Sequence, residues 1–248
     1  MKKNILNILK CLSLVGMMVF ADSCVRRDDS VLPTVSTVSP NSQKVAAGNT
    51  SGVMMQAFYW DVPMGGTWWG VIQGKVSSWA GAGVTSLWMP PASKGESGPY
   101  SVGYDPFDYF DFGDFNQKGT TETRYGSRAE MVSCINAAHT SGLKVYADIV
   151  MNHNGGGVSE NNPNTGGSSN TNFEVASGIF PRHYNDFHPS TFEAADAKVF
   201  AAYPDLCHKN PYVAGGLWGN TNSVAKYYKN TLGFDGWRKS NPVRLTWR

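Results

Sequence analysis

The sequence has little net charge and few cysteines, and both shortages exclude classes of function. Its 248 residues carry 21 Lys and Arg against 19 Asp and Glu, a formal net charge of +2. Nucleic-acid-binding domains concentrate basic residues on one face, so this balance argues against such a partner. Of the four cysteines, Cys11 and Cys24 lie at the N-terminus, which leaves only Cys134 and Cys207 for the folded part. No disulfide framework is therefore predicted.

Carboxylates are missing from the end of the chain, where no Asp or Glu follows Asp235. Aromatic residues, in contrast, are plentiful, with 8 Trp, 11 Tyr and 12 Phe. Such rings favour small neutral or polar ligands that stack on them.

The N-terminus has no apolar run long enough to span a bilayer, but it has the features of an export signal. Lys2 and Lys3 precede an apolar stretch at 11–21, which is too short for a membrane span. Small residues then precede Cys24, and this arrangement resembles a bacterial lipoprotein signal at 1–23. The alternative is ordinary secretion, with no modification of Cys24.

Residues 24–52 are rich in Ser, Thr, Pro, Asn and Gln, a composition typical of a flexible tether. We therefore expect a protein exported to the bacterial cell envelope, or secreted. A membrane would be contacted only through a lipid on Cys24.

Four apolar segments without alternation are typical of strands buried on both faces. They are residues 53–60, 84–89, 144–151 and 234–238. Three stretches with apolar residues at helical spacing lie between them, at 68–79, 127–142 and 224–232. This alternation predicts an α/β fold with parallel crossovers, either an open doubly wound sheet or a (β/α)₈ barrel.

Polar residues favour the barrel. No glycine-rich phosphate fingerprint follows a strand, whereas Asn152, His153 and Arg238 gather at strand ends, where barrel enzymes keep their chemistry. The prediction is a partial (β/α)₈ TIM barrel of about four strands, with a small domain inserted after the third. Its parts are a first barrel segment at 53–153, the insert at 154–219, a fourth unit at 220–238 and an off-pattern tail at 239–248.

Four motifs carry a resemblance to a known family. They are Gln56–Trp60, Gly103–Asp111, Asp148–His153 and Gly233–Arg238. Together they resemble the α-amylase family of glycoside hydrolases, and most closely its calcium-dependent, thermophile-like and plant-like members. The resemblance implies endo-acting hydrolysis of α-1,4-glucosidic bonds in starch and glycogen with retention of configuration. That reaction needs a carboxylate nucleophile and a carboxylic acid about 5 Å apart.

The resemblance also implies roles for single residues. Tyr104 would stack under the sugar being cleaved, and His153 would donate to its hydroxyls. Arg238 would lie beside the nucleophile and keep it ionised, with Asp148 orienting Arg238. The nucleophile position, however, holds Ser240, and a serine hydroxyl without an activating base is a poor nucleophile.

The insert is expected to bind calcium, because residues in and beside it match the family's ligands. These are Asn152, Asp196, Asp205 and the backbone carbonyl of Lys198. Zinc ligands of the thermophile-like relatives match His188 and Cys207, with Glu193 in place of a histidine. The alternative is a buried Cys207 and a surface His188 with no metal.

Two functional hypotheses follow. The first is the N-terminal part of an exported α-amylase, cut short and inactive as written because nucleophile and acid are missing. The second is a noncatalytic, membrane-tethered starch-binding protein that keeps Tyr104 and His153. In both cases the expected partner is an α-glucan.

Overall fold

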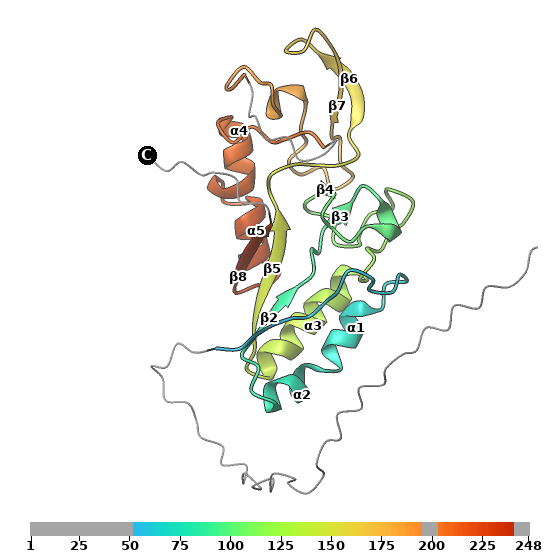
Figure 1. Cartoon of the computed structure of the whole chain (residues 1–248), viewed down its shortest axis with the longest axis vertical. Helices are drawn as coiled ribbons and strands as arrows, with labels where there is room; N and C mark the ends of the chain where they lie inside the picture. Colours follow the sequence, from blue (N-terminus) through green and yellow to red (C-terminus); the bar gives the residue numbers. More distant parts are fainter. Residues whose placement is uncertain (1–51, 195–202, 241–248) are drawn as a thin grey trace, which may run out of the picture. The chain divides into compact units, whose positions relative to one another are not determined.

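Four parallel strands form the main sheet in the part of the chain described by the computed structural model, residues 52–194 and 203–240 (Figure 1). They are β1 (Met54–Gln56), β2 (Ser86–Met89), β5 (Lys144–Val150) and β8 (Gly236–Ser240), adjacent in this order. Parallel neighbours require crossover connections, as predicted for the first strands of a barrel. The predicted signal, the tether and Cys24 lie outside the described residues.

Two strands, β1 and β8, end at residues clearly different from the predicted ones. β1 ends at Gln56 rather than Trp60, because the chain turns out of the sheet and Trp60 stacks on Tyr104 instead. β8 continues to Ser240, since Lys239 and Ser240 still pair with β5. The first two residues of the predicted tail therefore belong to the sheet.

The first predicted helix is two short helices, which corrects the single helix expected at 68–79. α1 (Trp68–Gln73) and α2 (Val76–Gly81) are separated at Gly74, a residue of low helix propensity. The apolar spacing in this stretch also predicts that Val71 faces the core, and this is wrong, because Val71 is 37% exposed. Trp69 is fully buried in its place.

The other helices agree with their sequence signals. α3 (Arg128–Thr140) begins with a capping box of Ser127 and Glu130, which the sequence signals through Glu three residues after Ser, and it packs beside α1 and β5. Met131, Ile135 and Ala138 are buried, as their spacing predicts; these three lie on its inner face. α5 (Val224–Asn230) precedes Gly233, whose φ of 90° only glycine adopts easily.

Two segments outside the main sheet have secondary structure of their own. The loop after β2 contains β3 (Lys94–Gly95) and β4 (Pro106–Asp108), which pair antiparallel, with a 3₁₀ turn, η1 (Gly98–Tyr100), between them. The segment after β5 contains a hairpin, two short turns and one short helix. These are β6 (Val158–Asn162), β7 (Gly167–Asn172), η2 (Tyr184–Asp186), α4 (Pro211–Ala214) and the π turn η3 (Gly215–Gly219).

Buried Arg182 ties the two segments together. Its guanidinium donates to the carbonyl oxygens of Phe107 and Phe180, each at 2.7 Å, one in the loop and one in the segment after β5. Within the described residues, we find no helix with the length and apolar character to cross a membrane.

Candidate active site

The strand register places a carboxylate and a guanidinium side by side toward the carboxyl ends of β5 and β8. Asp148 pairs with Arg238 in this parallel ladder, so their side chains leave the sheet on the same face. Arg238 Nη1 lies 3.3 Å from Asp148 Oδ2 and 3.4 Å from Oδ1. Asp148 is buried, at 1% exposure, whereas Arg238 is half-exposed. The two residues that the resemblance paired are therefore in contact.

Two further donors converge on the same carboxylate. The Tyr104 hydroxyl donates to Asp148 Oδ2 at 2.8 Å, and the Trp88 indole N–H donates to the same oxygen at 3.0 Å. Burial raises the pKa of Tyr104, and the negative charge of Asp148 raises it further, so Tyr104 stays protonated and keeps donating. Asp148 thus connects the ring expected under the sugar to the guanidinium of Arg238.

Sequence reasoning missed Trp88. It lies in an apolar run that was interpreted only as a buried strand, and its indole partner is 60 residues away in the sequence. The guanidinium of Arg238 also lies over the Trp88 ring, 4.5 Å from the ring centre, which is within the range of a cation–π contact.

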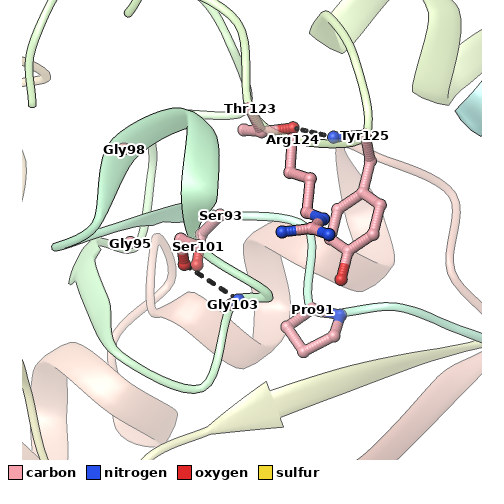
Figure 2. A pocket seen from close by; sticks show the side chains of 9 residues that line it. All are labelled: Pro91, Ser93, Gly95, Gly98, Ser101, Gly103, Thr123, Arg124 and Tyr125. Atoms are coloured by element: carbon pink, nitrogen blue, oxygen red, sulfur yellow. Dashed lines mark hydrogen bonds between the residues drawn. The ribbon is translucent and has the colours of Figure 1, made fainter. Parts of the chain in front are cut away.

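The loop residues around Gly103, which directly precedes Tyr104, are tightly packed (Figure 2). Gly103 precedes Tyr104 with a φ of 88°, and a Cβ there would lie 2.8 Å from the carbonyl oxygen of Pro91. The Gly103 N–H donates to Ser101 Oγ at 2.9 Å. On the other side Arg124 donates to the carbonyl oxygen of Tyr100 at 3.0 Å. Only glycine at 103 permits this close approach.

A cleft of about 260 Å³ opens beside Tyr104. Aromatic, hydroxyl and carboxylate side chains line it, namely Trp60, Ser97, Tyr100, Ser101, Val102, Tyr104, Asp105 and Tyr203. Trp60 stacks on Tyr104 with ring centres 6.0 Å apart and planes 8° apart. Trp60 and Tyr100 are 67% and 68% exposed, so their rings are available to a ligand.

His153 lies behind this cleft rather than on its surface. It is 1% exposed, its Nε2 is 3.0 Å from the carbonyl oxygen of Tyr104, and its ring stacks on Tyr203. Burial lowers the pKa of His153, although the hydrogen bond to Tyr104 opposes the shift. The structure thus brings His153 next to Tyr104, with Nε2 engaged by the backbone.

The candidate calcium residues meet where β5 leads into the inserted segment. Asn152 Nδ2 donates to Asp205 Oδ1 at 2.8 Å, and His188 Nδ1 lies 2.9 Å from Asp205 Oδ2. That contact with Asp205 raises the pKa of His188. Amide and carboxylate oxygens are ligands that calcium prefers. Asp196 and Lys198 lie outside the described residues.

The candidate zinc residues also come together. Ligand atoms of His188, Glu193 and Cys207 all lie within 4.8 Å of one another. His188 Nε2 is 3.3 Å from Glu193 Oε2, and Lys209 donates to the other oxygen of Glu193 at 2.5 Å. A nitrogen, a sulfur and a carboxylate oxygen are donors that zinc accepts. The alternative of a surface His188 is not what the structure has, since His188 is largely buried against Asp205.

Comparison with known proteins explains this arrangement. Residues 20–239 match the α-amylase catalytic-domain family. The chain belongs to that family. It is 45% identical to an α-amylase of Geobacillus stearothermophilus over 111 residues, which is 45% of this chain. It is 41% identical to the cytoplasmic α-amylase of Escherichia coli over 100 residues, which is 40% of this chain. Each match spans only 20% of the relative's length.

The solved structures bear on the fold alone. A maltogenic α-amylase from Thermotoga neapolitana superimposes with a TM-score of 0.53 at 16% sequence identity, covering 78% of this chain and 40% of that one. The α-amylase I of Eisenia fetida gives a TM-score of 0.50 at 17% identity, over 76% of this chain and 37% of that one. The predicted partial barrel and the family are both confirmed.

Proposed function

We propose that this chain forms the α-glucan-binding wall of an amylase-type site, the kind of site that in the family acts on internal α-1,4 bonds of starch or glycogen, and that the chain as written binds the glucan without cleaving it. The observation that carries the proposal is the buried carboxylate of Asp148, which accepts from Tyr104 and contacts Arg238. The cleft beside it is lined by exposed rings and hydroxyls, the mixture that suits a sugar with apolar faces and polar edges.

Each residue has a distinct task in this proposal. Tyr104 presents its ring to the bound glucose unit, and Trp60 extends the stacking surface. Asp148 holds the Tyr104 hydroxyl and the Arg238 guanidinium, so both face the carboxyl end of β8. His153 holds the backbone of Tyr104 from behind. A guanidinium at this point would lower the pKa of a carboxylate two residues further along the strand.

The position two residues after Arg238 holds Ser240 rather than a carboxylate. This serine determines the chemistry that we propose for the chain as written. A retaining mechanism needs a carboxylate to form the glycosyl-enzyme intermediate and a second carboxyl group to protonate the leaving oxygen. A serine hydroxyl cannot replace the first without a base that removes its proton. We therefore expect glucan binding without measurable hydrolysis.

Metal ions have a structural task in the proposal. Calcium would be held by Asn152 and Asp205, together with Asp196 and the Lys198 carbonyl, and would fasten the insert to the end of β5. Zinc would be held by His188, Glu193 and Cys207. The calcium proposal draws on the contact between Asn152 and Asp205, two residues with oxygen atoms that suit calcium, and the zinc proposal draws on the mixed donors at His188, Glu193 and Cys207.

The second candidate is a noncatalytic, membrane-tethered starch-binding protein. The specific observation that favours it is Ser240 in a chain that retains exposed Trp60 and Tyr100 beside Tyr104. Export would follow from the N-terminal signal, with a lipid on Cys24. Mass spectrometry of the protein isolated from bacterial membranes tests that part: diacylglycerol on Cys24 supports the tether, and an unmodified cysteine contradicts it.

One pair of assays on the purified full chain tests the function. Isothermal titration with maltoheptaose measures binding, and release of reducing ends from soluble starch measures hydrolysis. Binding without hydrolysis supports the proposal, with chitoheptaose as the control sugar. Release of reducing sugar would refute the proposed loss of catalysis. Failure to bind maltoheptaose would refute the glucan-binding wall itself.

A further inference from the structure

Trp88 lies between the two charged groups of the site and contacts both. Its indole N–H donates to Asp148 Oδ2 at 3.0 Å, and its ring face lies under the Arg238 guanidinium at 4.5 Å. We propose that Trp88 is a positioning residue for glucan binding, which sets the orientation of Asp148 and, through it, of Tyr104. The inference rests on the proposed function for its effect on glucan affinity.

The ring of Trp88 is fixed from several sides. The residue lies in β2, where it pairs with Gln56 of β1 and Tyr146 of β5. Its ring meets Phe58 edge to face, with ring centres 5.4 Å apart. These contacts hold the indole in the rotamer that points its N–H at Asp148.

That donor matters because the orientation of the buried Asp148 carboxylate depends on the groups that donate to it. The torsion that turns a carboxylate about its Cβ–Cγ bond is broad. Trp88 lies in strand β2 and packs against the core, whereas Tyr104 lies in a loop and Arg238 is half-exposed. Trp88 is the donor from the interior of the sheet, and its partner Oδ2 is also the acceptor of the Tyr104 hydroxyl. The direction of Tyr104 therefore depends on the indole N–H.

Packing alone would not require a tryptophan at this position. A phenylalanine would keep an aromatic face under Arg238 and an edge toward Phe58, but it has no N–H. The Trp88→Phe variant therefore separates the donor from the packing. Trp79→Phe is the matched control, because Trp79 is also partly buried against the core, in α2.

Titration of the full chain with maltoheptaose gives the first test. We expect Trp88→Phe to weaken the affinity by about tenfold, the equivalent of one hydrogen bond to a charged group, and Trp79→Phe to leave it unchanged. In a double-mutant cycle with Asp148→Asn, the two losses should not add, because both substitutions disrupt one contact. Equal affinity of Trp88→Phe and the unsubstituted chain, or fully additive losses, would overturn the inference.

A second test needs neither glucan binding nor a substitution of Trp88. The indole ¹⁵N–¹H resonance of native Trp88 should exchange slowly with solvent and shift in Asp148→Asn, whereas that of exposed Trp60 should exchange quickly and that of Trp79 in α2 should stay in place. An indole resonance of Trp88 that exchanges as fast as that of Trp60, or that ignores Asp148→Asn, overturns the inference. Absence of maltoheptaose binding by the unsubstituted chain overturns the proposed function, while the indole measurement still decides the contact with Asp148.

Discussion

Replacing Lys94 with methionine should destabilise the loop that carries Tyr104. The Lys94 side chain is fully buried, and its Nζ donates to the carbonyl oxygens of Thr121 at 2.5 Å and Thr120 at 2.9 Å. It also lies 3.5 Å from Asp111 Oδ2. The buried Lys94 ammonium thus holds the turn at Thr120 and Thr121 against strand β3.

The size of the effect follows from two opposed contributions. Removing one partner of a buried ion pair costs about 3–5 kcal/mol, because the other charge and the carbonyl oxygens lose their donor. Burial lowers the pKa of Lys94, and the nearby Asp111 carboxylate opposes that shift without cancelling it. Burying the ammonium charge is therefore unfavourable, and the Lys94→Met variant avoids part of this desolvation penalty. We therefore expect Lys94→Met to lower the free energy of unfolding by about 3 kcal/mol, at the low end of that range.

Urea unfolding at pH 7, followed by tryptophan fluorescence, measures this change. In thermal unfolding it corresponds to a fall in Tm of about 6–12 °C for a domain of this size. Lys229→Met is the control, because Lys229 is exposed in the last turn of α5 and its loss should cost less than about 0.5 kcal/mol. A loss below about 1 kcal/mol in Lys94→Met would refute the reasoning that this charge organises the loop.

Three other predictions concern the loop, the partly buried His208 and the metal. Gly103→Ala should lower the free energy of unfolding by about 2 kcal/mol or more, because left-handed strain of about 1–2 kcal/mol is joined by a clash with the carbonyl oxygen of Pro91. Gly119→Ala is the control, since Gly119 has open space around it and should show the strain alone. Equal urea midpoints for the two variants would contradict this prediction. Burial lowers the pKa of His208 below its ordinary 6.5, so the unfolded chain binds more protons between the lowered value and 6.5, and stability should fall as pH drops through that window. His208→Gln should flatten this fall in urea titrations at pH 7 and pH 5, and an unchanged slope would count against it. Zn²⁺ should raise the Tm of the chain, and Cys207→Ser should remove the increase; an equal increase in both would exclude the cluster as the binding site.

Local signals were sufficient for some elements and not for others. The capping box at Ser127 predicts the start of α3 because both of its partners lie within four residues. The break between α1 and α2 was missed, although Gly74 carried a signal for it, because the apolar spacing continues across the glycine. The sequence predicts a first strand that continues to Trp60 because only Gln56 interrupts the apolar run, and only the stacking on the distant ring of Tyr104 reveals that the chain leaves the sheet.

The candidate site was predictable where strand register fixed it. Asp148 and Arg238 meet because parallel strands carry them to the same edge, and the family motifs supplied their identity. Trp88 was not predictable in the same way, since an indole in an apolar strand has no pattern that distinguishes a packing role from a donor role. The contact of His153 with the Tyr104 backbone likewise depends on a chain separation of 49 residues, which no local spacing encodes.

The most direct test of the account compares maltoheptaose binding by the full chain and by Tyr104→Ala, with soluble starch present in a parallel assay for reducing sugar. The account predicts that the unsubstituted chain binds, that Tyr104→Ala loses the affinity, and that neither releases reducing sugar. Equal binding by the two proteins, or hydrolysis by either, would contradict it.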